Sequence, residues 1–171
     1  KNDEWSHGYD LNRVFTSSDR SLGVITEITV KIQPLPEYNA LALAIFHDLF
    51  AAGNAVTEII GSGIQLTACE ILDNYSLKVV EEAIGKDVSR IEAMLIIESD
   101  GVRETVTRDM EQIGAICKKH GVEEFTWSDD PAKTGEIMEA RGKLVPTLSR
   151  IKPGNRLVAI SEDLGIPPTR I

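Results

Sequence analysis

Short apolar runs alternate with stretches of helical periodicity along most of the chain. The runs have the length of buried strands, and they cover residues 40–46, 66–73, 92–99 and 122–127. Apolar residues recur every three or four positions, as on one face of a helix, over residues 49–60, 74–85, 105–120 and 131–144. This order of elements predicts an α+β fold, a ferredoxin-like split βαβ sandwich with one antiparallel sheet and helices on one of its faces.

Residues that start or stop helices stand at the expected boundaries. Asp48 can cap the first of these helices, and the sequence GSG ends it at residues 61–63. Asn74 is the expected cap of the second helix, and Asp130, which a proline follows, opens the last one. Pro146 is expected to interrupt or end that last helix.

A further strand pattern precedes this series. Residues 23–32 alternate apolar with polar side chains and are rich in β-branched residues, and two prolines follow within residues 33–39. We therefore expect a strand, a linker and a domain boundary that separates residues 1–36 from residues 37–171. Because the strand needs cover, we expect residues 1–36 to stay disordered, to pack back on the sheet or to pair between two chains. A homodimer is the preferred outcome.

Composition and charge exclude several classes of protein. The 171 residues include 27 acidic and 18 basic side chains, a net charge of −9, so no nucleic-acid partner is expected. No apolar run approaches the roughly 20 residues of a membrane span, and the N-terminus lacks the apolar region of a signal peptide. Cys69 and Cys117 suit unpaired thiols in a reducing cytosol, so a cytoplasmic location is expected. The three histidines have no metal-ligand spacing, and no metal site is predicted.

Residues 8–34, GYDLNRVFTSSDRSLGVITEITVKIQP, carry the most specific pattern. The segment resembles a signature of FAD-linked oxidases with a vanillyl-alcohol-oxidase-type flavin domain. This branch includes glycolate oxidase flavoprotein subunits, D-lactate dehydrogenases, other D-2-hydroxy-acid dehydrogenases and alkyl-dihydroxyacetone-phosphate synthases. The family pattern runs G-Y-D-L, a phenylalanine, G-S-E-G-T-L-G-V-I-T-E, a strand and a proline-containing exit.

The resemblance implies that this segment contacts the cofactor FAD. The implied contact residues are Ser18, Asp19, Arg20, Ser21, Leu22, Gly23, Val24 and Ile25. Glycine lets the backbone approach a nucleotide closely, and small hydroxyl side chains can hydrogen-bond its phosphate or ribose. Asp19 and Ser21 stand for the family's glutamate and threonine. Two further departures matter more, since Ser17 and Arg20 stand where the family has glycines. Arg20 can pair with a pyrophosphate or block binding, and the sequence leaves both possibilities open.

The resemblance continues more loosely through the rest of the chain. TACEILD (67–73) is similar to an A-L-E-L-M-D strand of the family's cap domain, and EDLGIPPTRI (162–171) to the segment that returns to the flavin domain. IMEARGKLVPTL (137–148) is similar to the W-x-x-R helix of the cap, with Met138 in place of the tryptophan. Arg141 then matches the arginine that binds the substrate carboxylate in D-2-hydroxy-acid members. A guanidinium suits this role because it pairs with a carboxylate bidentately.

One alternative remains open for Arg141, and two other residues bear on the substrate. Arg141 can instead be a solvated helix arginine beside Glu136, Glu139 or another acid. Val145 and Ser161 stand where 2-hydroxyglutarate enzymes have a threonine and a lysine, which argues against 2-hydroxyglutarate as the substrate.

We therefore interpret the chain as an internal fragment of an FAD-dependent oxidoreductase. The implied reaction oxidises a small 2-hydroxy acid, of glycolate or D-lactate type, by hydride transfer to flavin, with an acceptor protein, quinone or oxygen as electron acceptor. The family's pyrophosphate loops are expected before this segment and its histidine metal ligands after it, so no catalytic residue is assigned and the isolated chain is expected to be inactive. The alternative is a self-standing ferredoxin-like binding or assembly module without catalysis. The length of the open reading frame distinguishes the two.

Overall fold

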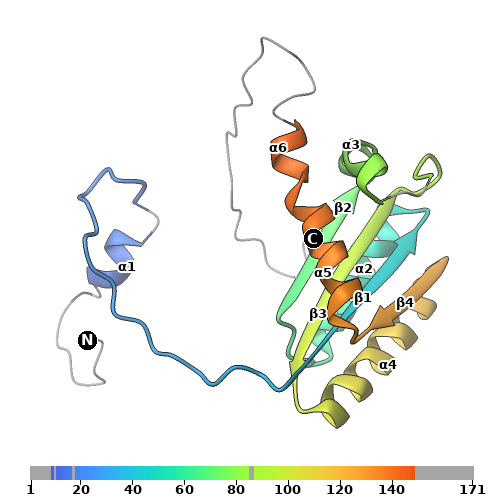
Figure 1. The fold of residues 1–171 in the computed structure, drawn as a ribbon, viewed down its shortest axis with the longest axis horizontal. Coiled ribbons are helices and arrows are strands. Elements are labelled where there is room, and N and C mark those ends of the chain that lie inside the picture. The colour runs from blue at the N-terminus through green and yellow to red at the C-terminus, as the bar shows by residue number, and fades with distance from the viewer. Residues whose placement is uncertain (1–8, 10, 17, 85–86, 149–171) are drawn as a thin grey trace. The chain divides into compact units, whose positions relative to one another are not determined.

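The computed structural model describes residues 9, 11–16, 18–84 and 87–148 (Figure 1). The chain divides into two compact units, Lys1–Pro34 and Leu35–Ile171. The boundary lies within three residues of the one expected from the prolines.

The larger unit is built on a four-stranded antiparallel sheet. Its strands are β1 (Tyr38–Phe46), β2 (Ala68–Asp73), β3 (Ala93–Gly101) and β4 (Glu124–Ser128). Their order across the sheet is β2-β3-β1-β4, and every neighbouring pair is antiparallel. This is the order that two interleaved βαβ units produce, so the ferredoxin-like prediction is confirmed.

One face of the sheet is covered by the two long helices of those units. The helices α2 (Leu49–Gly61) and α4 (Arg103–Lys119) pack on Ala40, Ala42, Ala44 and Phe46 of β1 and on the same face of β3. Alanine side chains on the central strand let the helix backbones approach closely. Burial of the apolar stripes of both helices then stabilises this main core.

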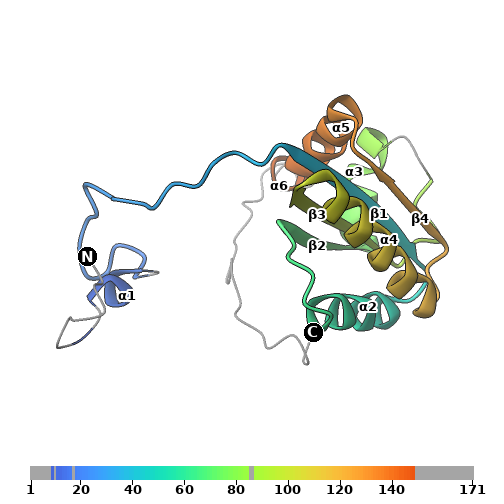
Figure 2. The ribbon, with the colours of Figure 1, turned by 90° about the horizontal axis from the view of Figure 1, so that it is seen from below.

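The second face is also covered, which corrects the expectation of helices on one face only. The helices α3 (Asn74–Ile84), α5 (Pro131–Gly142) and α6 (Leu144–Leu148) lie on the side opposite α2 (Figure 2). A second core forms there around Leu41, Ile45 and Ile96, with Leu77 from α3 buried in it. The reason is in the central strands, whose outward positions are as apolar as their inward ones and therefore need a second layer.

Helix caps agree with the sequence at two of three positions. The carboxylate of Asp48 accepts a hydrogen bond from the backbone N–H of Phe50 at 2.8 Å, and that of Asp130 accepts one from Ala132 at 3.0 Å. The expected cap at Asn74 is wrong. Asp73 accepts from the N–H of Ser76 instead, while the amide of Asn74 donates to the carbonyl oxygens of Val88 and Ile91, at 3.2 and 2.6 Å.

The predicted interruption near Pro146 occurs three residues earlier. Helix α5 ends at Gly142, Lys143 caps it, and Pro146 then lies in the first turn of α6. Proline is tolerated in a first turn because the backbone N–H groups there have no intrahelical partner.

The predicted strand over residues 23–32 does not form. In the smaller unit a short helix, α1 (Leu11–Phe15), is followed by a turn at residues 18–21. Residues 23–36 have no regular secondary structure, and apolar side chains such as Val24, Ile28 and Ile32 are exposed. A strand exists only when a neighbouring strand accepts its hydrogen bonds, and none pairs with this segment among the described residues.

No described helix combines the length and the apolar character that a bilayer crossing requires.

Candidate functional site

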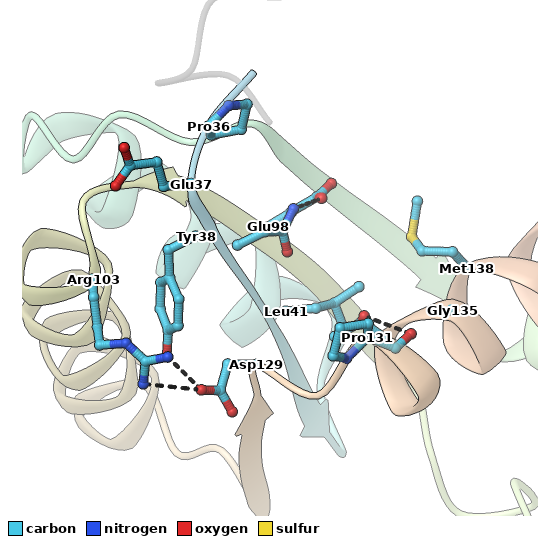
Figure 3. A pocket seen from close by; sticks show the side chains of 12 residues that line it. Pro36, Glu37, Tyr38, Leu41, Glu98, Arg103, Asp129, Pro131, Gly135 and Met138 are labelled. Atoms are coloured by element: carbon cyan, nitrogen blue, oxygen red, sulfur yellow. Dashed lines mark hydrogen bonds and ion pairs between the residues drawn. The ribbon is translucent and has the colours of Figure 1, made fainter. Parts of the chain in front are cut away.

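A pocket of about 580 Å³ opens where β1 begins and α5 crosses the sheet (Figure 3). Its lining comes from the first residues of β1, the end of β3, the loop before α5 and the exposed turns of α5. Leu41 and Met138 give the pocket apolar surface, and Asn39 and Glu98 give it polar groups. An apolar hollow with a few polar groups is the usual form of a small-molecule site.

The sheet register brings two carboxylates to the pocket side of the sheet. Glu98 of β3 lies opposite Leu41 of β1 and opposite Ala68 of β2. Glu70 follows Ala68 by two residues, and side chains two apart on a strand share a face. The amide of Asn39 donates a hydrogen bond to the carboxylate of Glu98, so that carboxylate has a fixed partner.

Arg141 joins this polar group from α5. Its Nε donates to one carboxylate oxygen of Glu70, and its Nη2 contacts the other oxygen. Met138, which lines the pocket, precedes Arg141 by three residues, so the two side chains lie on the same side of α5. This pair is the one that the alternative of a helix arginine beside an acid allows, with Glu70 as the acid. Glu139 pairs with Lys143 instead, at 2.8 Å.

The other wall of the pocket is a cluster of three side chains. The Tyr38 hydroxyl donates to Asp129 at 2.7 Å, and the Arg103 guanidinium lies 3.6 Å from the same carboxylate. The guanidinium also stacks on the Tyr38 ring, 4.3 Å from its centre. The hydrogen bond from Tyr38, with the charge of Arg103, lowers the pKa of Asp129, and the same bond raises the pKa of Tyr38. The cluster ties β1, α4 and the loop before α5 together. Sequence reasoning missed it because its members are far apart in the chain.

The segment implied to contact FAD forms a tight turn in the smaller unit. The backbone N–H and the hydroxyl of Ser21 donate to the carbonyl oxygen of Ser18, at 2.8 and 2.6 Å. Asp19 and Arg20 have φ values of 46° and 66°, in the left-handed region that glycine adopts most easily. Arg20 thus has the backbone conformation expected of the glycine that it replaces in the resemblance. Successive N–H groups in such a turn can hold an anion, so the segment fits a phosphate contact.

The remaining implied residues of this segment lie around the turn. Leu22, Val24 and Ile25 are exposed, and Gly23 stands next to Phe15, whose Cε1 would lie 3.4 Å from a Cβ at residue 23. Ser17 lies outside the described residues. So do the side chain of Val145 and the whole of residues 149–171, which include Ser161 and the segment EDLGIPPTRI.

In the described part of the chain the thiols are free and two histidines pair with carboxylates. Cys69 and Cys117 are free, as predicted, and burial raises their pKa values to about 11 and about 12. His47 pairs with Glu123 at 2.6 Å, and His120 with Glu58 at 2.7 Å. No group of three metal-ligating side chains occurs among the described residues.

Comparisons with known proteins identify curated relatives. The glycolate oxidase subunit GlcD of Bacillus subtilis (strain 168) is 39% identical over 166 residues, which are 96% of this chain and 34% of that protein. The subunit GlcD of Escherichia coli (strain K12) is 37% identical over 150 residues, 86% of this chain and 30% of that protein. The mitochondrial D-lactate dehydrogenase (cytochrome) of Arabidopsis thaliana is 30% identical over 161 residues, 94% of this chain and 28% of that protein. The chain thus spans about a third of the length of these relatives.

A solved structure and a family match complete the comparison. An alkyldihydroxyacetonephosphate synthase structure superposes with a TM-score of 0.61 at 16% identity, over 84% of this chain and 29% of that one, and supports the fold alone. Residues 35–171 match the family described as FAD linked oxidases, C-terminal domain. Since this match covers most of the 171 residues, the chain belongs to the FAD-linked oxidases and contains their C-terminal domain.

Proposed function

We propose that this chain is part of an FAD-dependent oxidoreductase that oxidises a small 2-hydroxy acid of glycolate or D-lactate type. The family match and the names of the relatives, glycolate oxidase subunits and a D-lactate dehydrogenase, support this class of reaction. The described residues supply the substrate-binding side of the site, and no catalytic base is assigned among them.

The observation that carries the proposal is the position of Arg141. It is a cation on α5, three residues after Met138, which lines the pocket, and its guanidinium is oriented by Glu70. A small 2-hydroxy acid presents one carboxylate, which an arginine binds through two parallel, charge-assisted hydrogen bonds. Leu41 and Met138 provide the apolar contact that a short carbon chain needs.

The FAD-binding site is assigned to the smaller unit together with other parts of the longer parent protein. Ser18, Asp19, Arg20, Ser21, Leu22, Gly23, Val24 and Ile25 would contact FAD, and the left-handed turn at Asp19 and Arg20 supports a phosphate contact. Residues 1–36 would close the flavin domain, and residues 37–171 would form the cap. FAD, when bound, supplies the redox chemistry, and the residues described here bind and orient the substrate.

The partners follow from this class of reaction. Electrons must leave the flavin, and an acceptor protein, a quinone or oxygen can take them. The uncovered apolar residues of the segment 22–35 support self-association of this chain as a homodimer. The free thiols of Cys69 and Cys117 are in keeping with a reducing cytoplasm.

The test is made on the full-length parent protein. Purified enzyme with bound flavin is mixed anaerobically with glycolate, D-lactate or L-lactate, and the absorbance of oxidised flavin is followed. We expect at least one small 2-hydroxy acid to bleach the flavin, while its methyl ester, which lacks the carboxylate charge, does so far more slowly. A flavin that stays oxidised with every such acid would refute the proposed function.

A further inference from the structure

The contact between Arg141 and Glu70 uses only one edge of the guanidinium. A guanidinium has two edges that can each hold a carboxylate, one made by Nε and Nη2 and the other by Nη1 and Nη2. Glu70 takes the first edge, with one oxygen on Nε and the other on Nη2. The contact is therefore bidentate and fixes the plane of the guanidinium.

The second edge is open to a ligand. The Arg141 side chain is 43% exposed, and within the described part of the chain Nη1 has no partner. The same part of α5 faces the pocket through Met138. A small carboxylate in the pocket region can therefore bind Nη1 and the outer hydrogen of Nη2, without displacing Glu70.

The backbone of Glu70 lies within the sheet, whereas that of Arg141 lies on a lightly packed helix. Glu70 lies within β2 opposite Ile96 of β3, and its side chain is 29% exposed. Helix α5 has no fully buried residue, and it meets the second core only through partly buried side chains such as Ile137 and Met138. A long side chain on so lightly packed a helix needs an anchor on the sheet to keep one orientation.

We propose that Glu70 is a positioning residue for the substrate carboxylate. It binds the Nε–Nη2 edge of Arg141 and so presents the Nη1–Nη2 edge to the carboxylate of a 2-hydroxy acid. The proposal rests on the proposed function, because it gives a role to Glu70 through Arg141. Glu70 itself contacts no substrate.

The experiment compares Glu70→Gln, Arg141→Ala and the double variant in the full-length flavoprotein. The probe is oxalate, an unreactive carboxylate analogue, and its Kd is measured by calorimetry and by the shift of the flavin spectrum. Loss of a charge-assisted pair predicts a Kd increase of roughly 100-fold for Arg141→Ala and roughly 10-fold for Glu70→Gln. Because Glu70 acts through Arg141, the double variant should bind no more weakly than Arg141→Ala alone.

Steady-state kinetics separate positioning from a merely structural role. Glu70→Gln should raise KM with little change in kcat, and leave the flavin content and melting temperature near those of the wild type. If Glu70→Gln lowers the flavin content or the melting temperature, Glu70→Asp is used in its place. Aspartate keeps the charge but reaches less far, so the Kd for oxalate should rise by less than about 10-fold. Glu139→Gln, an exposed carboxylate on the same helix paired with Lys143, is the control and should change nothing.

Three outcomes decide the proposal. The predicted pattern supports it. The proposal is overturned if Glu70→Gln and Glu70→Asp both bind oxalate with the wild-type Kd. It is also overturned if the double variant binds oxalate about 10-fold more weakly than Arg141→Ala. Both outcomes leave the role of Arg141 intact. An unchanged Kd in Arg141→Ala overturns both this inference and the assignment of Arg141 under the proposed function.

Discussion

The ring of Phe125 lies directly against Gly114, so that a Cβ atom at residue 114 would stand 2.8 Å from the ring atom Cε1. Glycine at this position lets α4 approach β4 more closely than any other residue would allow. We predict that Gly114→Ala destabilises the chain by about 1 kcal/mol, because a clash of ~2 kcal/mol outweighs the ~1 kcal/mol gain in helix propensity. Thermal melting should show a loss of several degrees.

Gly61, the last residue of α2, is the matched control. A Cβ there would meet nothing within 4 Å. Gly61→Ala should therefore leave the melting temperature unchanged or raise it slightly. Equal stabilisation by both substitutions would show that the Phe125 ring moves aside at no cost.

The half-buried thiol of Cys69 and the buried thiol of Cys117 should be almost unreactive in the folded chain. Burial raises the pKa of Cys69 to about 11 and that of Cys117 to about 12, so only a small fraction is thiolate at pH 8. We expect both to react with Ellman's reagent roughly 100-fold more slowly than in guanidinium chloride. Intact mass before reaction should show no disulfide. Rapid labelling of one thiol in native buffer would contradict its burial.

Glu58 should make the chain sensitive to acid. Hydrogen bonds from Lys119 and His120, at 2.8 and 2.7 Å, lower the pKa of Glu58 below its ordinary value of 4.5. A lowered pKa means that the unfolded chain takes up the proton first, so this stabilisation is present above about pH 4.5 and is lost as the pH falls through the folded pKa.

Glu58→Gln should lower the denaturation midpoint at pH 7 and flatten its dependence on pH between about 5 and 3. Urea titrations across this range measure the effect. Glu111→Gln, an exposed residue of α4, is the control. An identical pH dependence in wild type and Glu58→Gln would show that the contact between α2 and α4 contributes no acid sensitivity.

The apolar side chains of residues 22–35 should cause the isolated chain to self-associate. Ile28 and Val30 are 75% and 69% exposed, and an extended segment of this kind offers unpaired backbone groups to a second copy. Light scattering should give a dimer at high concentration, and Ile28→Lys should give a monomer. A wild-type chain that stays monomeric at millimolar concentration would refute the homodimer.

Local patterns predicted most of the larger unit because its elements are strongly periodic. The strand at Tyr38–Phe46 and the helix at Leu49–Gly61 begin and end within two residues of the predicted positions. The layer on the second face was missed, although Leu41 and Ile45 already make that side of β1 apolar. A strand was wrongly expected at residues 23–32, because periodicity reports the shape of a side-chain pattern and not the presence of a neighbour to pair with.

Beside the pocket, the sequence selects a single candidate residue, and its role stays a prediction. Arg141 could be selected from its resemblance to a family helix. Its partner Glu70 stands 71 residues earlier, and only the sheet register and the path of α5 bring the two together. The same holds for Tyr38 and Asp129, which are 91 residues apart.

If Arg141 binds the carboxylate of a 2-hydroxy acid, the rate at which that acid reduces the flavin must depend on Arg141. The measurement is stopped-flow reduction of the full-length flavoprotein by the best 2-hydroxy acid. Arg141→Lys should lower the second-order rate constant at least ~10-fold, since charge alone does not replace the two parallel hydrogen bonds of a guanidinium. Arg141→Ala should lower it roughly 100-fold. Arg90→Lys, an exposed arginine whose backbone carbonyl contacts His47, should react like the wild type. Wild-type rate constants in Arg141→Ala, with flavin fully bound, would show that Arg141 does not bind the substrate carboxylate.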